Sequence, residues 1–510
     1  MAVVESVRRL GPYELTGRLG EGASGEVFEA MDTRRQVPVA LKRLKDPTPE
    51  EILRLKHEFR ALQDLQHPNV VSLGELSQHE GQLFYTMGLV RGLNLVAYVR
   101  GAPHESGTFA GRGPWAVEAG GFSEERLRGA FEQLVVALMA VHGAGLVHRD
   151  IKPSNVLVDE RGHVTLLDFG MTARVRDLVA LAEAGGDGLV VGTVAYMAPE
   201  QATGEAVGPA ADYYAVGVAL FEALTGALPF RGDFASVLSR KVGSDAPAPS
   251  AFNRAVPPDL DALCSALLQR DEHLRPHGAE VLRRLRRDGP RTGLASVPPS
   301  TDEAPAAPLI GRAAELETLE RAGRSARSHA VSVVVRGESG VGKSALVQRY
   351  LSQHAEAGGW VLASRCYERE SVPFKAIDGL IDALAHRLAS DPEPPAVDVG
   401  LLTRTFPVLR MVPAYAEAHA EPAKDAAEAR ARLFGSLRAL LAALANRAPL
   451  LLFIDDLHWT DQDSLELLGD LLRGADPPRL LLIATTRPLG AAAGLRPFGL
   501  PGDVRPLDVG

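Results

Sequence analysis

The chain has 510 residues, which is enough for roughly three domains of average size. Its 46% hydrophobic and 23% charged residues are ordinary for a folded protein, and its formal net charge of -9 argues against a nucleic-acid binder held by its overall field. No apolar run is long enough to span a membrane, and the N-terminal residues lack the apolar core of a signal peptide. We therefore expect a cytoplasmic protein without direct nucleic-acid binding or a membrane segment.

Arginine is the usual cation of this chain, because only eight of its 55 lysines and arginines are lysine. Arginine offers a planar fork of donors, whereas lysine offers a compact charge on a flexible stem. Each lysine is therefore mild evidence that a compact ammonium group was needed at that position.

Pattern and composition divide the chain into four parts. Residues 1–12 form an N-terminal extension, and residues 13–287 form a first domain that changes from short apolar runs with turns to mostly helical patterns. Residues 288–307 are rich in Gly, Pro, Ser and Ala and are expected to be a linker. Residues 308–510 form a second domain.

The second domain alternates helical patterns with almost wholly apolar runs at Val331–Val335, Leu450–Ile454 and Leu480–Ala484. Such runs are typical of strands buried on both faces of a parallel sheet. We therefore expect an α+β first domain followed by an α/β domain with a parallel sheet.

A glycine-rich motif opens the first domain. Leu19 to Val27 reads L-G-E-G-A-S-G-E-V, which places Gly20, Gly22 and Gly25 in GxGxxG spacing. Alone this pattern fits a plain turn equally well, because glycine is abundant in this chain. The sequence V-A-L-K, which ends at Lys42, follows this motif and makes a plain turn less favoured.

A helix is predicted to start at T-P-E-E, with Thr48 as N-cap, Pro49 in the first turn and Glu51 as the reciprocal cap. Glu58 lies farther along this helix, where it could reach back to Lys42. An isolated glutamate at such a position is more often a solvated helix charge.

Two later motifs settle the interpretation of the first domain. H-R-D-I-K-P-S-N spans His148 to Asn155, and D-F-G begins at Asp168. With G-T-V-A-Y-M-A-P-E and D-Y-Y-A-V-G following in order, residues 13–287 resemble the eukaryotic-like (Hanks-type) Ser/Thr protein kinases of bacteria.

The resemblance implies a bilobal kinase fold, with ATP and Mg²⁺ as cofactors and protein Ser/Thr hydroxyls as acceptors. It also implies roles for individual residues. Asp150 would accept the acceptor proton, supported by Lys152, Thr193 and the Lys42–Glu58 pair. The implied nucleotide contacts are Gly20, Gly22, Gly25, Val27, Lys42 and Leu89, and the implied metal ligands are Asn155 and Asp168.

A second nucleotide site is indicated in the second domain. An apolar strand runs into G-E-S-G-V-G-K-S, the GxxxxGK[ST] pattern of a P-loop. Its backbone N–H groups would cradle phosphates, Lys343 would reach the β- and γ-phosphates, and Ser344 would bind Mg²⁺. The residues expected to form this cradle are Gly337, Gly340, Gly342, Lys343 and Ser344.

Paired acids follow a later apolar strand in L-L-L-F-I-D-D-L-H-W. We expect Asp455 to be the acid on the metal side and Asp456 to orient or activate water. The alternative is that the pair only caps a helix.

The motifs D-D-x-H-W, L-I-G-R-A-A-E-L and T-T-R-P resemble the signal-transducing AAA-type ATPases, and C-Y-E-R-E-S-V-P-F-K-A-I-D resembles PknK-like multidomain kinases. The resemblance makes Arg487 a sensor of the γ-phosphate, although its spacing fits an exposed strand-end arginine equally well. Because that family continues into a lid, we expect this domain to be C-terminally incomplete.

The sequence thus predicts a protein Ser/Thr kinase regulated by an attached nucleotide-dependent switch, with protein substrates as partners and oligomerisation through the ATPase domain as an option. The alternative is a non-catalytic scaffold, in which a pseudokinase and a nucleotide switch assemble a signalling or transcriptional complex. The full set of catalytic residue types weakens this alternative.

Overall fold

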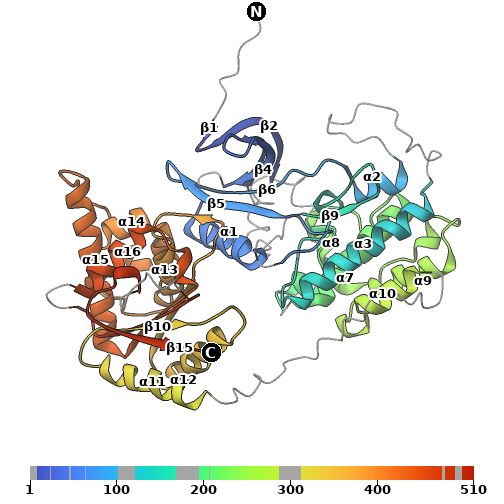
Figure 1. Ribbon diagram of the computed structural model, residues 1–510. Coiled ribbons are helices and arrows are strands. Elements are labelled where there is room, and N and C mark those ends of the chain that lie inside the picture. Colours follow the sequence, from blue (N-terminus) through green and yellow to red (C-terminus); the bar gives the residue numbers. More distant parts are fainter. Residues whose placement is uncertain are drawn as a thin grey trace, which may run out of the picture. The chain divides into compact units, whose positions relative to one another are not determined.

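The computed structural model describes residues 9–22, 25–44, 47–63, 65–101, 121–167, 194–205, 207–286, 312–473, 477–488 and 497–510. The chain divides into two compact units (Figure 1). Unit 1 contains Met1–Lys45, His57–Gly74 and Tyr85–Thr301; unit 2 contains Asp46–Lys56, Glu75–Phe84 and Asp302–Gly510.

The first sheet of the chain begins with strands β1 to β4, which pair antiparallel within unit 1. Its strands follow the order β1-β2-β3-β4-β6-β5, and β12 lies beside the unit 2 part of β5. The bounds are β1 Arg9–Leu10, β2 Tyr13–Gly22, β3 Gly25–Asp32, β4 Val37–Arg43, β5 Leu73–His79, β6 Gln82–Gly88 and β12 Glu370–Ser371.

Helix α1 (Pro49–Leu62) starts where the sequence predicts. The backbone N–H of Thr48 donates to Glu51 Oε2 at 2.8 Å, and the backbone N–H of Glu51 donates to Thr48 Oγ1 at 3.3 Å. This reciprocal capping satisfies two N–H groups that would otherwise lack partners in the first turn.

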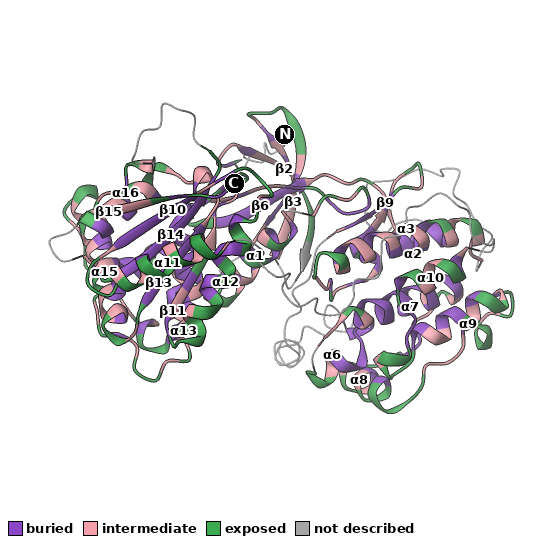
Figure 2. Ribbon diagram, turned by 60° about the horizontal axis from the view of Figure 1, so that its bottom comes forward, coloured by how far each residue is buried: buried purple, intermediate pink, exposed green. Residues whose placement is uncertain are grey.

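The remainder of unit 1 is mainly helical. Helix α7 is buried along almost its whole length and packs against α2, α3 and α9 (Figure 2). A small sheet in the order β7-β8-β9 lies beside these helices. The bounds are β7 Leu93–Asn94, α2 Leu95–Arg100, α3 Glu124–Gly143, β8 Val156–Val158, β9 Val164–Leu166, α6 Pro199–Thr203, α7 Pro209–Thr225, α8 Phe234–Gly243, α9 Pro258–Leu267 and α10 Gly278–Leu285.

Unit 2 is built on a five-stranded parallel sheet in the order β11-β13-β14-β10-β15. The strands are β10 Val331–Arg336, β11 Trp360–Arg365, β13 Leu450–Asp455, β14 Leu480–Thr486 and β15 Asp503–Asp508. The helices are α11 Ala313–Ser325, α12 Lys343–Glu356, α13 Lys375–Leu388, α14 Gly400–Thr405, α15 Ala426–Arg447 and α16 Gln462–Arg473.

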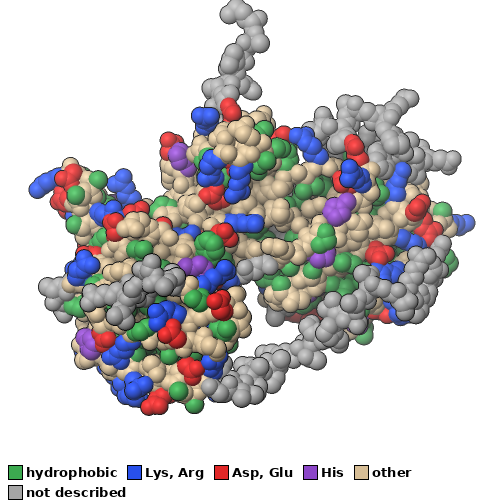
Figure 3. Space-filling model, viewed as in Figure 1, with side chains coloured by type: hydrophobic (Ala, Val, Ile, Leu, Met, Phe, Trp, Pro, Cys, Tyr) green, Lys and Arg blue, Asp and Glu red, His purple; other side chains and the backbone are tan. Residues whose placement is uncertain are grey.

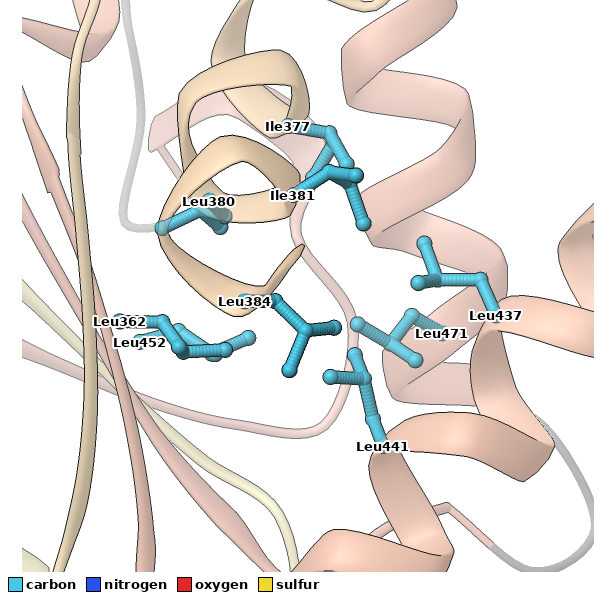
Figure 4. Close-up of a pocket in the computed structure, with 9 residues that line it drawn as sticks. All are labelled: Leu362, Ile377, Leu380, Ile381, Leu384, Leu437, Leu441, Leu452 and Leu471. Atoms are coloured by element: carbon cyan, nitrogen blue, oxygen red, sulfur yellow. The ribbon is translucent and has the colours of Figure 1, made fainter. Parts of the chain in front are cut away.

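Two apolar cores cover the two faces of this sheet. Along β13, Leu450, Leu452 and Ile454 belong to a core with α13, α15 and α16, whereas Leu451 and Phe453 belong to a core with α11 and α12. Figure 4 shows aliphatic side chains from α13, α15, α16 and two strands converging on a small pocket in the first core. The predicted α+β and parallel α/β folds are thus confirmed.

Unit 2 also holds a buried ionic cluster. Lys56, in the middle of α1, donates to Asp378 Oδ1 at 2.6 Å and to Asp382 Oδ1 at 3.2 Å, and all three residues are buried. The two carboxylates are one turn apart on α13, so the single ammonium group offsets their repulsion.

On the face shown in Figure 3, cationic and anionic side chains are interleaved. Within the described residues, no helix combines the length and apolar character needed to cross a bilayer.

Candidate phosphoryl-transfer and nucleotide sites

The described glycines of the glycine-rich motif lie at the end of β2 and the start of β3. Gly22 pairs with Gly25, and Gly20 pairs with Val27 on the neighbouring strand. Gly25 has φ of +119°, and a Cβ there would lie 2.3 Å from the carbonyl oxygen of Arg43. Only glycine fits, so backbone alone lines this part of the turn, as close approach to phosphate requires.

Lys42 and Glu58 are brought together as the sequence analysis anticipated. Lys42 Nζ lies 3.3 Å from Glu58 Oε1, and the two residues are 1% and 7% exposed. The hydroxyl of Tyr85 donates to the same Oε1 at 2.8 Å. The glutamate is therefore held by two partners and is not a solvated helix charge.

The loop after His148 gathers the three polar side chains of the predicted catalytic loop. Lys152 Nζ lies 2.8 Å from Asp150 Oδ2. Asn155 Nδ2 donates to the same Oδ2 and to the backbone oxygen of Asp150, both at 2.9 Å. One carboxylate is thus oriented by an ammonium and an amide at once.

Asp212, at the start of α7, binds the backbone of this loop. The sequence analysis gave this residue no role. It is 1% exposed and accepts from the backbone N–H groups of His148 at 2.9 Å and Arg149 at 2.7 Å. His142 Nε2 lies 2.8 Å from its Oδ2. An acid in the first turn of a mostly apolar helix, within the motif D-Y-Y-A-V-G, was the available signal.

Arg149 adopts φ of +67°, a conformation that non-glycine residues rarely enter. The hydrogen bonds of Asp212 with the backbone N–H groups of His148 and Arg149 hold the strained turn. His148 extends the network, since its Nε2 lies 2.9 Å from the carbonyl oxygen of Leu167. The predicted residues Asp168 and Thr193 lie outside the described part of the chain, whereas Leu89 follows β6 and is half-buried.

The P-loop of unit 2 connects β10 to α12. Gly340 and Gly342 have φ of +84° and +91°, and α12 begins at Lys343. Lys343 Nζ donates to the carbonyl oxygens of Gly337 and Glu338, both at 2.8 Å. A Cβ on Gly337 would lie 2.4 Å from the carbonyl oxygen of Val509, so this position also requires glycine.

Ser344 and Asp455 meet at the carboxyl end of the sheet. Ser344 Oγ lies 3.3 and 3.2 Å from the two carboxylate oxygens of Asp455, and Thr485 Oγ1 also donates to this carboxylate. A hydroxyl from the first turn after the P-loop and a carboxylate at the end of β13 lie side by side, and this pair fits a Mg²⁺ ion, which prefers oxygen ligands.

Asp456 has φ of +55°, and its backbone N–H donates to Thr485 Oγ1 at 2.9 Å. Its carboxylate accepts from Arg365 Nε at 3.1 Å, and it makes no capping hydrogen bond to the short helix Leu457–Trp459. The helix-cap alternative therefore lacks its defining contact. Thr485, which braces both acids, was not singled out from the sequence because strand-end threonines are common.

His458 is close to these acids in sequence, and Arg487 follows β14, the strand beside β13. Burial lowers the pKa of His458, and both of its ring nitrogens lack a hydrogen-bond partner in the described structure. Arg487 follows β14 and is exposed, and its side chain forms no ion pair with a described residue. The structure thus does not connect Arg487 to Asp455 or Asp456.

Two protein families match this chain. Residues 13–285 match the protein kinase domain family, and residues 308–483 match the AAA ATPase domain family.

Curated relatives match the first of these regions. The chain is 34% identical over 258 residues to the serine/threonine-protein kinase PknE of Mycobacterium bovis, which covers 50% of this chain and 42% of the relative. It is 36% identical over 279 residues to the DNA damage-responsive serine/threonine-protein kinase RqkA of Deinococcus radiodurans, covering 54% and 39%. The chain therefore spans about two fifths of the length of these relatives.

Among solved structures, the kinase domain of Mycobacterium tuberculosis PknI matches with 22% identity and a TM-score of 0.41, covering 56% of this chain and 98% of that domain.

Proposed function

Because the chain belongs to the protein kinase family, we propose that it transfers the γ-phosphate of ATP to Ser and Thr hydroxyls of proteins. The observation that carries this proposal is the joint presence of the buried Lys42–Glu58 pair and the Asp150 carboxylate oriented by Lys152 and Asn155. The names of the similar relatives, serine/threonine-protein kinases, favour the same acceptor class.

Phosphoryl transfer depends mainly on position and charge, so each residue needs only a limited role. When bound, Mg²⁺–ATP supplies the phosphoryl group. Glu58 holds the Lys42 ammonium where it can grip the α- and β-phosphates, and the β2–β3 turn covers them with backbone N–H groups. Val27 and Leu89 would flank the base.

Asp150 is proposed to accept the proton of the attacking hydroxyl. Lys152 lies 2.8 Å from its carboxylate and would neutralise charge that gathers there. Asn155 fixes the orientation of the carboxylate and would share metal binding with Asp168. Thr193 is proposed to assist the position of Asp150 and Lys152.

Unit 2 is proposed to bind a second ATP with Mg²⁺ and to act as a nucleotide-dependent switch. Gly337, Gly340, Gly342 and Lys343 would hold the phosphates, and Ser344 with Asp455 would hold the metal. Asp456 would orient a water molecule, and Arg487 would sense the γ-phosphate. The contact of Ser344 with Asp455 supports the metal assignment.

A non-catalytic scaffold would not need a proton acceptor oriented by two partners. The geometry around Asp150 therefore favours catalysis over the scaffold alternative. The proposed partners are cytoplasmic protein substrates, and self-association through unit 2 is proposed as a further property of the switch.

The full-length chain incubated with labelled ATP and Mg²⁺ tests the proposal. Label on Ser or Thr residues of protein supports a kinase, whereas release of free phosphate alone supports a switch without kinase activity. The Asp150→Asn variant is the control, because it keeps the shape of the side chain and removes the proton acceptor.

A further inference from the structure

His458 is a mostly buried histidine of unit 2 whose ring nitrogens are unpaired in the described structure. It lies in the short helix Leu457–Trp459, which follows the two acids at the end of β13. Its side chain is 14% exposed, both ring nitrogens are closed off from solvent, and neither has a hydrogen-bond partner among the described residues. Buried polar atoms of this kind are rare and lower the stability of a fold, so their presence needs a reason.

Packing alone does not supply that reason. The ring of His458 lies beside the ring of Trp459, with centroids 5.1 Å apart. A phenyl ring would make a similar contact without burying two unpaired nitrogens. A polar ligand that binds to the imidazole therefore explains this residue better than packing does.

The charged groups around His458 belong to the second nucleotide site. Its Nδ1 lies 4.0 Å from Asp456 Oδ1. Burial lowers the pKa of His458, and the charges of Arg487 and Lys343 lower it further. Asp456 and Asp455 oppose this shift. The imidazole is therefore neutral near pH 7, and it lies within the field of the P-loop lysine and of both acids.

The position of Asp456 decides which nitrogen of the neutral ring carries the hydrogen. A neutral imidazole has one N–H donor and one acceptor nitrogen. Because a carboxylate only accepts, the hydrogen is favoured on Nδ1, which faces Asp456, and Nε2 is left as the acceptor. Arg365 donates to the other carboxylate oxygen of Asp456 at 3.1 Å and keeps this acid in place. Phosphate oxygens are also acceptors, so a water molecule matches Nε2 and a phosphate group does not.

We propose that His458 is a catalytic residue of the second nucleotide site, where its Nε2 accepts a hydrogen bond from the water molecule that attacks the γ-phosphate of ATP. This inference rests on the proposed nucleotide binding by unit 2 and deepens it, because it assigns the contact that hydrolysis needs. Asp456, proposed to orient water, acts on the water through this ring.

The reaction at this site is a displacement at the γ-phosphorus. The water oxygen forms a bond to this phosphorus while the bond from the phosphorus to the β–γ bridging oxygen breaks, which leaves ADP. One proton of the water stays on the phosphate that is formed, and the other passes to Nε2 and is then released to solvent. Because the ring nitrogens of His458 are closed off from solvent, other water molecules are kept from the reacting atoms.

The test uses the full-length chain with Lys42→Ala as the parent, so that turnover at the nucleotide site of unit 1 is suppressed. Adding Lys343→Ala to the parent gives the background. His458→Phe keeps a ring and removes both nitrogens, whereas His458→Gln retains an acceptor near the place of Nε2. His386→Phe is the matched control, because it makes the same substitution at an exposed position of α13. Affinity for a fluorescent ATP analogue, kcat and KM for ATP hydrolysis, and the urea midpoint are measured for each protein.

His458→Phe is expected to lower kcat for hydrolysis by about tenfold or more and to change the affinity for the analogue by less than about threefold. Its urea midpoint should equal or exceed that of the parent, because two unpaired buried nitrogens are removed. His458→Gln should recover part of the hydrolysis, and His386→Phe should resemble the parent.

The tautomer of His458 gives a second readout that does not depend on activity. An NMR spectrum of the parent with isotope-labelled histidine, recorded without nucleotide, should show the Nδ1–H form. The signals that disappear in His458→Gln identify the residue.

Unchanged hydrolysis in His458→Phe, or an Nε2–H tautomer in the spectrum, would overturn the inference and leave nucleotide binding by unit 2 intact. A parallel loss of affinity, hydrolysis and stability would show a structural role instead. A parent that binds the analogue at the second site but hydrolyses no ATP there would also overturn the inference alone. A parent that binds no nucleotide at that site would contradict the proposed function of unit 2 and the inference with it.

Discussion

Lys42 Nζ lies 3.3 Å from Glu58 Oε1, inside a region where both side chains are almost completely withdrawn from water. Stability alone does not explain a buried ion pair, because a protein with apolar residues of similar size in its place is often equally stable. A negatively charged ligand that binds to Lys42 would explain why these two charged residues are present. The pair therefore links the fold of unit 1 to nucleotide chemistry.

Glu58→Gln is expected to keep the contact with Tyr85 but to remove the carboxylate charge that lies beside the Lys42 ammonium. Breaking a buried pair typically lowers the free energy of unfolding by about 3–5 kcal/mol. Chemical denaturation measures this loss, and a phosphorylation assay measures the accompanying loss of activity. Equal stability and activity in the variant would show that the pair is not needed.

Asp212→Asn is expected to disturb the turn at Arg149. The carboxylate now accepts from the backbone N–H groups of His148 and Arg149, and the NH2 group of the asparagine cannot accept from either of them. An unsatisfied buried donor costs about 1–3 kcal/mol, and the rate should fall with it. The fold-decrease in kcat should be larger than the fold-increase in KM for ATP. Asp245→Asn, at an exposed ion pair, is the control and should change stability and rate very little.

Lys343→Ala is expected to weaken nucleotide binding at unit 2 by about tenfold to a hundredfold, since each charge-assisted hydrogen bond contributes about 1.5–3 kcal/mol. A fluorescent ATP analogue reports this affinity in a chain whose first site carries Lys42→Ala. Arg349→Ala removes an exposed cation from the same helix and serves as the control. Equal affinity in Lys343→Ala would mean that the P-loop does not hold the nucleotide.

Lys241 gives unfolding a predictable pH dependence. Burial, followed by the charge of Arg275, lowers the pKa of Lys241 from 10.5 to about 7, and Glu200 opposes this shift. Between these values the unfolded chain binds more protons than the folded chain, so stability should rise with pH. Urea midpoints measured from pH 7 to pH 10 should rise in the wild type and rise less in Lys241→Met. Parallel curves would contradict this assignment.

Leu384→Ala tests the core shown in Figure 4. Leu384 is 0% exposed on α13, and truncating a fully buried leucine typically costs about 2–5 kcal/mol. The unfolding transition of unit 2 should move to lower denaturant. Leu274→Ala, at a site that is 65% exposed, should change stability very little. Similar effects of the two substitutions would show that the core is not packed as described.

Local patterns in the sequence predicted much of this structure. The capping box at Thr48 and Glu51 depends on residues three positions apart, and the apolar runs of β10, β13 and β14 follow directly from burial on both faces of a sheet. Motif spacing was also enough to anticipate that Glu58 could meet Lys42. In these cases the interacting residues are close in sequence or belong to a widely shared pattern.

The contacts that the sequence analysis missed are all long-range. Asp212 meets the backbone of His148 from 64 positions away, and Lys241 reaches Ala195 across 46 positions. No periodic pattern in the sequence indicates either contact, because each depends on how separate segments of the chain pack together. The division of α1 between two units was equally hidden, since Lys56 meets Asp378 across 322 positions.

Phosphoamino-acid analysis of the full-length chain and its Asp150→Asn variant, after incubation with labelled ATP and Mg²⁺, tests the central claim most directly. The wild type is expected to carry label on Ser or Thr residues. Asp150→Asn should bind ATP with similar affinity but label about 10²–10⁴ times more slowly, the usual effect of losing a catalytic base. Equal labelling by the two proteins, or no protein labelling by the wild type, would contradict the assignment of Asp150 and the proposed kinase function.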